Sequence, residues 1–430
     1  MNQPLKIAIA GLGTVGAATF QLLRDQATLL SMRCGREILI SAVSARDRDR
    51  NRGIDLKDID WVENPLNLAR HPEIDAVVEL IGGSEGIARE LVEETLIAGR
   101  HVVTANKALL AHHGTELARL AEGNGASIWY EAAVAGGIPI VKALRDGLAG
   151  NSVERVYGIL NGTCNYILTA MRESGREFDD VLAEAQSLGY AEADPSFDID
   201  GVDTAHKLSI LTALAFGTEV NFDAIHIEGI RGVSADDIIF AEEMGYRVKL
   251  LGIARRTDHG VEQRVHPCLV APTSPIAYVE DAYNAVVVDG NNVGTTVYQG
   301  KGAGGKPTAS AVIADIMDIA RDVQVATFAV PAGDLTPSKP ASMEHRIGSF
   351  YICMTVRDQP GVMAEITATF RDEMISLESM LQRGRAPGEA VPVVLITHET
   401  EETAMVRALE YISGLDTMVA PPRMIRIETL

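Results

Sequence analysis

Short apolar runs alternate with amphipathic stretches through the first third of the chain. Residues 6–10, 38–43, 75–83, 101–105 and 127–131 have the composition of buried strands, and helical spacing of apolar positions separates several of them. Strands that alternate with helices in this way are typical of a parallel, doubly wound sheet. We therefore predict an α/β unit over residues 1–150, with ligands at the carboxyl ends of its strands.

The apolar pattern changes beyond residue 151. Residues 153–160 alternate between apolar and polar positions, as in a strand with one open face, and the β-rich segments 261–271, 285–289 and 295–299 are expected to complete the same sheet. We predict an α+β unit over 151–335, and the helix at 308–330 could pack back on the first unit. A proline-containing linker at 336–340 follows.

The last part of the chain has a third pattern. Strands are expected at 350–356, 375–382, 391–397 and 423–427, and helices at 362–371 and 402–412. This order is a compact βαββαβ unit, which we assign to residues 349–430.

The composition excludes several classes of protein. With 430 residues, 47 % apolar and 23 % charged, the chain is typical of an ordinary soluble protein of two or three domains. The net charge of −21 argues against nucleic-acid binding. No apolar run approaches the roughly 18–20 residues of a membrane span, and no cleavable signal is evident, so we expect a cytoplasmic location without membrane partners. The four cysteines lack the spacing of a zinc site or a disulfide framework.

A glycine motif follows the first predicted strand. Gly11, Gly13 and Gly16 form GxGxxG with Thr14 and Val15 between them, and a helical pattern begins there. Glycines at these positions let the backbone turn tightly and approach a pyrophosphate held by the helix N-terminus. The strand before and the helix after favour a dinucleotide site of the Rossmann type over a simple glycine-rich turn.

The end of the second strand bears on the choice of cofactor. Arg46 stands where an NAD-preferring site usually carries an acid, which favours NADP and its 2′-phosphate. The neighbouring Asp47 keeps NAD possible. Arg48 and Arg50 are as readily explained by a solvated run of charges.

Three further positions are candidates for cofactor contacts. Gly82 ends the third strand in a glycine turn, and Lys107 follows the fourth strand, where it could contact nicotinamide or substrate, or simply be exposed. Gly302 lies in a glycine-rich loop at 300–305 that could reach the cofactor from the other side.

The strongest candidate chemistry lies between Glu192 and Lys207. A helix predicted from Asp203 to Gly217 puts Asp203 and Lys207 on its apolar stripe, four residues apart. The alternative is an ordinary surface pair. Burial of the pair, with the acids Glu192, Asp194 and Asp198 just before it, favours a polar ligand pocket.

The loop after the last N-terminal strand also offers ligands. Glu131 is followed by several bare carbonyls before a helix predicted at 139–148. Such oxygens could hold a monovalent cation, although a plain turn explains the loop nearly as well.

Four motifs in this order resemble the homoserine dehydrogenase family over essentially the whole chain. They are the GxGxxG motif, residues 104–107 (TANK), 161–166 (NGTCNY) and 198–207 (DIDGVDTAHK). The βαββαβ unit, with the turn at 358–361, resembles an ACT domain. The resemblance implies reversible NAD(P)H-dependent reduction of L-aspartate 4-semialdehyde to L-homoserine, in the pathway to threonine, methionine and isoleucine. It also implies a homodimer or homotetramer joined through the 151–335 unit.

The resemblance assigns roles residue by residue. Lys207 corresponds to the proton donor and Asp203 to its partner. Substrate contacts correspond to Glu192, Asp198, Lys107, Gly162 and Thr163, and a sodium site to the carboxylate of Glu131 with the carbonyls of Val134, Gly136 and Ile138. Threonine is expected as an inhibitor that binds near Gly361.

Two rival functions remain open from the sequence. Aspartate-semialdehyde dehydrogenase shares the substrate but needs a thiolate nucleophile, and Cys164 is the one tempting candidate, in a turn without an evident histidine base. A non-catalytic amino-acid sensor would use the βαββαβ unit for its ligand. A buried Asp203–Lys207 pair argues against that sensor, because a scaffold has no reason to bear the desolvation cost.

Overall fold

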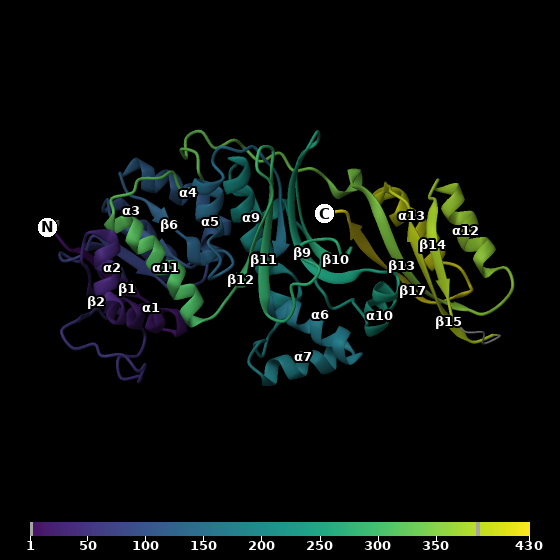
Figure 1. Ribbon diagram of the computed structural model, residues 1–430, viewed down its shortest axis with the longest axis horizontal. Helices are drawn as coiled ribbons and strands as arrows, with labels where there is room; N and C mark the ends of the chain where they lie inside the picture. Colours follow the sequence, from purple (N-terminus) through teal and green to yellow (C-terminus); the bar gives the residue numbers. More distant parts are fainter. Residues whose placement is uncertain (1–2, 384–387) are drawn as a thin grey trace.

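The computed structural model describes residues 3–383 and 388–430; residues 1–2 and 384–387 of the predicted terminal units lie outside this range. Three parts follow one another along the long axis of the molecule, with the N-terminal unit at one end and the βαββαβ unit at the other (Figure 1). In the described residues no helix is both long and apolar enough to cross a membrane.

The N-terminal part is a six-stranded parallel sheet in the order β3-β2-β1-β4-β5-β6. Its strands are β1 (Leu5–Ala10), β2 (Ile38–Ser44), β3 (Asp60–Trp61), β4 (Ala76–Glu79), β5 (His101–Thr104) and β6 (Ile128–Trp129). Its helices are α1 (Thr14–Asp25), α2 (Ala27–Cys34), α3 (Ile87–Ile97) and α4 (Lys107–Gly123). The predicted doubly wound sheet is confirmed, since the short β-rich runs are buried on both faces.

A helix from much later in the chain completes this part. Helix α11 (Gly305–Ala320) packs along α1, and Val312, Ile316 and Ile319 join the apolar core beneath the sheet. It ends ten residues before the predicted limit of 330, because Asp322 has a positive φ of 56°. The segment predicted as a helix at 139–148 is shorter as well: α5 (Ile140–Lys142) widens into one π-helical turn over Ala143–Gly147.

The middle part is a mixed sheet covered by helices. Its strands run in the order β12-β11-β7-β9-β10, with β8 beside β10. Their bounds are β7 (Val153–Ile159), β8 (His226–Ile227), β9 (Arg247–Thr257), β10 (Gly260–Val270), β11 (Tyr283–Gly290) and β12 (Gly294–Lys301). The helices are α6 (Gly162–Ser174), α7 (Phe178–Ser187), α8 (Ser196–Ile199), α9 (Val202–Phe216) and α10 (Ala235–Glu243). Helix α9 contacts β7, β9 and β10, so nearly all of its side chains are buried.

The C-terminal part has the predicted βαββαβ order. Its elements are β13 (Ile347–Arg357), α12 (Val362–Asp372), β14 (Leu377–Gln382), β15 (Ala390–Thr397), β16 (Thr400–Glu401), α13 (Glu402–Ser413) and β17 (Met418–Glu428). Strand β17 also pairs in parallel with β10, through Cys268–Val270 and Arg426–Glu428. One sheet therefore continues from the middle part into the C-terminal part. Four 3₁₀ turns complete the described chain, at Pro65–Arg70, Glu131–Ala133, Phe222–Ala224 and Met343–His345.

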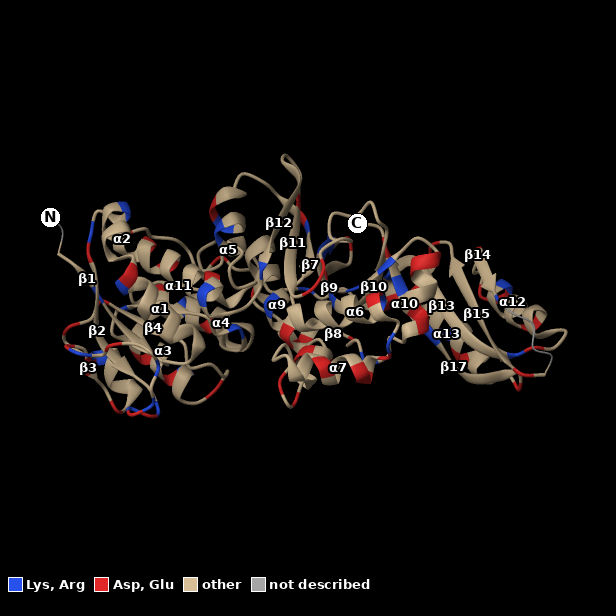
Figure 2. Cartoon of the chain, turned by 60° about the horizontal axis from the view of Figure 1, so that its bottom comes forward, with Lys and Arg blue, Asp and Glu red and all other residues tan. Residues whose placement is uncertain are grey.

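Charged side chains line the junction around β10 and β17. Figure 2 shows acidic and basic segments close together where α10 and β10 meet β13. Arg264, only 1 % exposed, donates to Glu428 over 2.8 Å and contacts Glu262, and Arg346 donates to the other Glu428 oxygen over 2.9 Å. Buried charges need such partners, so these ion pairs fix the register of the two strands.

Candidate functional site

A cavity of about 940 Å³ lies between the N-terminal and middle parts. The N-terminal ends of α4, α6 and α9 reach it, together with the loops at 281–284 and 301–304. We call it the central cavity. It brings together Lys107, Gly162, Thr163, Asp198, Asp203, Lys207 and Gly302 from the predicted site, with Asn161, Tyr190 and Asp281 beside them.

Lys207 is fixed from two sides. Its Nζ donates to Asp203 Oδ2 over 2.6 Å and to the Leu160 carbonyl over 2.7 Å. Both charged side chains are buried, as their place on the apolar stripe of α9 predicted. The ammonium therefore has one remaining N–H for a group in the cavity.

Asn161 connects the carboxylates of the site. Its Nδ2 donates to Asp198 Oδ1 and to Asp203 Oδ2, each over 2.8 Å, while its Oδ1 caps α6 by accepting from the N–H of Cys164. Asn161 was not among the predicted site residues, although it opens the NGT motif. An asparagine just before a helix is a preferred cap, and that was the available signal.

Lys107 reaches the same carboxylate from the opposite part of the molecule. It is the first residue of α4, whose cap is Asn106, and its Nζ lies 3.2 Å from Asp203 Oδ1. The ammonium also lies 5.6 Å from the centre of the Phe197 ring. Asp203 thus joins an N-terminal lysine to a lysine of the middle part across the cavity.

The pKa values of Asp203 and Asp198 are shifted in opposite directions. Burial alone would raise the pKa of Asp203, but the ammonium groups of Lys207 and Lys107 outweigh it and hold the pKa well below its ordinary value. Burial, with the charge of Asp203 nearby, raises the pKa of Asp198 despite its hydrogen bonds to Asn161 and Thr163. Asp203 is therefore the firm counter-ion of the lysines.

Of the remaining predicted substrate residues, Thr163 and Gly162 line the central cavity and Glu192 does not. Thr163 donates to the Tyr190 carbonyl over 2.8 Å, and its Oγ1 lies 3.3 Å from Asp198 Oδ2. Gly162 lies where a Cβ would be 2.8 Å from the Ala282 carbonyl oxygen, so this close approach requires glycine. Glu192 is exposed on its loop and is not among the residues that line the central cavity.

A second cavity, of about 760 Å³, opens at the carboxyl ends of β1 and β2. Gly11, Gly13 and Arg46 line it, whereas Val15 and Gly302 line the central cavity, so the start of α1 stands between the two. At Gly16 a Cβ would lie 1.9 Å from the Gly11 carbonyl oxygen. The first turn of α1 therefore packs closely against the loop at Gly11, and Thr14 is the first residue of α1.

Side-chain hydrogen bonds hold the strand ends around this second cavity, and those of Glu79 and Arg52 were not predicted. Glu79, fully buried, accepts the backbone N–H groups of Ile81 and Gly82 over 2.7 and 3.0 Å and the Thr104 hydroxyl over 2.6 Å. The Asp47 carboxylate accepts the N–H groups of residues 49 and 50, and Arg52 donates to the carbonyls of Leu12 and Asp47.

The loop after Glu131 combines a carboxylate with free carbonyls. Glu131 accepts the N–H groups of Val141 and Lys142 over 2.8 and 2.9 Å. Among the described residues, no hydrogen bond reaches the buried carbonyls of Val134 and Gly136, whereas that of Ile138 accepts from Ile140. Burial, reinforced by Asp315, raises the pKa of Glu131 to about 7. Such oxygens suit a cation that would neutralise the carboxylate.

Cys164 does not have the surroundings of a catalytic nucleophile. Its thiol is fully buried and lies 3.2 Å from the Asp198 carbonyl oxygen, to which it donates. Burial and the charges of Asp198 and Asp203 raise its pKa well above the ordinary value. The thiolate that an acylating dehydrogenase needs is therefore disfavoured.

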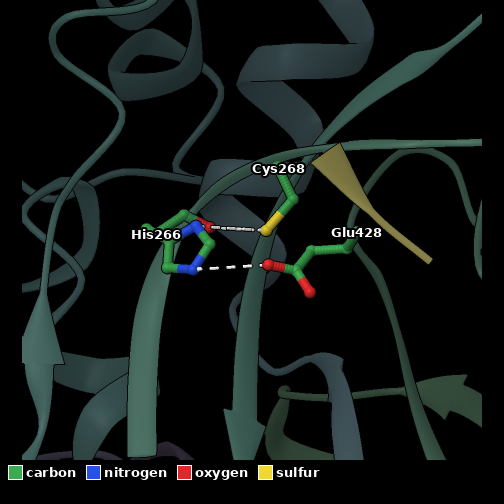
Figure 3. A group of neighbouring side chains, drawn as sticks. All are labelled: His266, Cys268 and Glu428. Carbon is green, nitrogen blue, oxygen red and sulfur yellow. Dashed lines mark hydrogen bonds and ion pairs between the residues drawn. The ribbon is translucent and has the colours of Figure 1, made fainter. Parts of the chain in front are cut away.

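His266, Cys268 and Glu428 form another cluster, with ligand atoms within 4.8 Å of one another (Figure 3). Arg264 donates to the ring of His266 over 3.1 Å and to Glu428, and burial raises the pKa of Cys268 well above its ordinary value. The Arg264 guanidinium occupies His266 and Glu428, and the Cys268 thiol stays protonated, so the cluster does not suit a metal ion. The cluster belongs to the junction of β10 and β17.

Comparison with known proteins accounts for all three parts. The family model described as "Homoserine dehydrogenase, NAD binding domain" matches residues 11–131, "Homoserine dehydrogenase" matches 139–317 and "ACT domain" matches 351–414. A homoserine dehydrogenase of Neisseria gonorrhoeae is 46 % identical over 434 residues, which cover 100 % of this chain and 99 % of that protein.

Solved structures agree with these matches. The crystal structure of a homoserine dehydrogenase from Thiobacillus denitrificans has a TM-score of 0.94 and 45 % identity, and the match covers 99 % of this chain and 98 % of that one. A hyperthermophilic archaeal homoserine dehydrogenase in complex with NADPH has a TM-score of 0.64 and 28 % identity, over 75 % of this chain and 100 % of that one.

Proposed function

The chain belongs to the homoserine dehydrogenase family, and from this premise we propose that Lys207 is the proton donor for reduction of L-aspartate 4-semialdehyde to L-homoserine. The enzyme is an NAD(P)-dependent oxidoreductase of aspartate-family amino-acid biosynthesis. The observation that carries the assignment is the buried ammonium of Lys207, held by Asp203 and the Leu160 carbonyl, with one N–H free toward the cavity.

The reaction needs a hydride and a proton. The nicotinamide cofactor, when bound, supplies the hydride to the aldehyde carbon. As negative charge develops on the aldehyde oxygen, Lys207 stabilises it and then transfers a proton to it. Asp203, whose pKa is held well below its ordinary value, remains ionised throughout and orients the Nζ of Lys207. In the reverse direction Lys207 acts as the neutral amine, accepts the hydroxyl proton of homoserine and becomes the ammonium.

We assign the amino-acid end of the substrate to the acids around α6 and α8. Asp198, 2.8 Å from Asn161 and 3.3 Å from Thr163, offers a carboxylate to the α-ammonium group, and Lys107 offers a positive charge to the α-carboxylate. Gly162 leaves room beside them. Glu192 requires its loop to move inward on binding, since it is exposed in this structure.

The test of the catalytic assignment is the initial rate of NADP reduction with L-homoserine, for the parent enzyme and Lys207→Ala. We expect the rate to fall on the order of 10²–10⁴-fold, with the affinity for NADPH retained. Lys339→Ala removes an exposed lysine and serves as the control. Equal losses of rate and NADPH affinity would contradict the role, and NADPH binding without turnover by the parent enzyme would favour the sensor.

NADP is the proposed preferred cofactor. The Asp47 carboxylate is already engaged by backbone N–H groups, which leaves it poorly placed to bind a ribose hydroxyl, whereas Arg46 lines the same cavity. Arg46→Ala should weaken NADP much more than NAD, because only NADP carries the 2′-phosphate. Asp47→Ala is the matched control, and an equal loss for both cofactors in Arg46→Ala would refute the preference.

A sodium ion is the proposed occupant of the Glu131 loop. Two buried carbonyls without donors among the described residues and a carboxylate of raised pKa support it, together with the carbonyl of Ile138. Activity in buffers of tetramethylammonium should then rise on addition of sodium chloride, and Glu131→Gln should lose that response. A parent enzyme whose activity does not change on addition of sodium chloride would refute the proposal.

Threonine is the proposed effector, bound near Gly361, and the assembly is proposed to be a homodimer or homotetramer. Gly361 precedes α12 with a φ of 100°, and a Cβ added there would meet no described atom within 4 Å, so a ligand can approach its backbone. Gly361→Val in the full-length chain should reduce inhibition by threonine, and the rate without threonine should stay that of the parent. Light scattering of the purified protein would give the number of subunits.

A further inference from the structure

One wall of the central cavity is the segment at 279–284, which leads into β11. Asp281, Ala282, Tyr283 and Asn284 line the cavity, and Asp281 has a positive φ of 54°. The Ala282 carbonyl approaches the backbone at Gly162, where a Cβ would be 2.8 Å away. The position of this wall therefore sets the width of the cavity beside α6.

Buried side chains behind the wall hold its backbone. Asn165, 1 % exposed on α6, has its Nδ2 within 3.0 Å of the Val279 carbonyl oxygen, 2.9 Å of that of Asp281 and 3.3 Å of that of Tyr283. A single amide group thus gathers three alternate carbonyls of the segment. The hydrogen bonds form only when the carbonyls of Val279, Asp281 and Tyr283 all point toward Asn165, so they fix the backbone of the segment.

Lys249 supports the same contacts from β9. Its Nζ, on a residue 2 % exposed, donates to the Val279 carbonyl over 2.6 Å and to Asn165 Oδ1 over 3.3 Å. The second contact orients the amide so that its NH₂ faces the wall. Lys249 Nζ also lies 3.6 Å from Glu280, whose carboxylate accepts from Arg172 and from the Thr169 hydroxyl.

Packing alone does not account for an ammonium at this place. Burial lowers the pKa of Lys249 to about 8, against the opposing effect of Glu280, and an apolar side chain of similar size would usually avoid that desolvation cost. Neither Lys249 nor Asn165 lines the central cavity. A positively charged donor at this place hydrogen-bonds to the wall and at the same time orients the amide of Asn165.

We propose that Lys249 and Asn165 are positioning residues for the substrate, which act by holding the wall at 279–283 against α6. The inference rests on the assignment of the central cavity to homoserine. It predicts that loss of Lys249 changes the affinity for homoserine more than it changes protein stability or cofactor binding.

The experiment compares steady-state kinetics of Lys249→Met with those of the full-length parent. We expect KM for homoserine to rise about ten-fold, with kcat reduced less than about three-fold. NADPH affinity and melting temperature should stay close to those of the parent, since Arg172 still pairs with Glu280. Lys249→Arg keeps a charged donor and should recover most of the affinity.

Leu250→Ala is the matched structural control. Leu250 is buried in the same strand and points to the opposite face, so its truncation should lower the melting temperature and leave KM unchanged. A parent-like KM in Lys249→Met, or a loss of melting temperature with KM unchanged, would overturn the inference. Failure of the parent enzyme to oxidise homoserine would instead overturn the proposed function. If Lys249→Met does not fold, Glu280→Gln, whose side chain is partly exposed, should still raise KM.

Discussion

A pair of histidines at the contact of α4 and α9 should make the enzyme sensitive to acid. His206 precedes Lys207 on α9, and its Nε2 lies 3.2 Å from the Nε2 of His112 on α4. Its ring also packs against Phe222 and Phe197, and its buried Nδ1 has no hydrogen-bond partner among the described residues. Protonation of His206 would place a charge in this apolar contact between α4 and α9, the helices that carry Lys107 and Lys207.

The size of the effect follows from the pKa. Burial, together with His112, lowers the pKa of His206 from 6.5 to about 4, despite the opposing charge of Asp203. The unfolded chain therefore binds a proton more readily than the folded one between these values, and stability is lost as the pH falls below 6.5. From pH 7 to pH 5 the loss from this residue is about 2 kcal/mol.

The assay is thermal unfolding of the parent and His206→Gln between pH 7 and pH 5. Glutamine does not titrate and can still bond to His112, so in a chain of 430 residues the variant should lose roughly 2–3 °C less than the parent over this range. His345→Gln, which changes an exposed histidine, should keep the parent slope. Parallel curves for the parent and His206→Gln would refute the assignment of the acid effect to this residue.

Two further substitutions test the packing of the motif and of the junction. Gly16→Ala should abolish NADPH binding, measured by fluorescence titration, because its Cβ would lie 1.9 Å from the Gly11 carbonyl oxygen; Gly123→Ala, with open space around its Cβ, should bind normally. Arg264→Met should lower the free energy of unfolding by about 3–5 kcal/mol, because Glu428 and Glu262 lose a buried partner; an unchanged denaturation midpoint would contradict this.

Local sequence patterns predicted those parts of the site that lie within one helix or one turn. Asp203 and Lys207 are one helical turn apart on an apolar stripe, so their burial and their contact followed from spacing alone. The GxGxxG turn likewise needed only its own strand and helix. The family resemblance was confirmed by the matches over the whole chain.

Long-range contacts were beyond the sequence patterns. Strand β9, whose Lys249 interrupts its apolar residues, was not predicted. The pairing of β10 with β17 joins residues more than 150 positions apart, and no periodicity encodes it. Asn161 was not among the predicted site residues, yet it links two carboxylates that come from α8 and α9.

This continuity of the sheet bears on how regulation can be tested. Removal of residues 349–430 would take away β17, leave the backbone of Cys268–Val270 as an open edge and strip Arg264 of Glu428. Asp237 on α10 would also lose Arg423, which donates to it over 2.8 Å. An open edge and unpaired buried charges are both destabilising.

We therefore expect the truncated chain to melt well below the parent and to lose activity even without threonine. Loss of threonine inhibition in such a protein would say little about where threonine binds, because the catalytic sheet is altered at the same time. Differential scanning calorimetry of the two chains checks this. A truncated enzyme that melts at the parent's temperature and keeps full activity without threonine would mean that β17 does not stabilise the sheet of the middle part. Truncation would then be a fair test of the effector site.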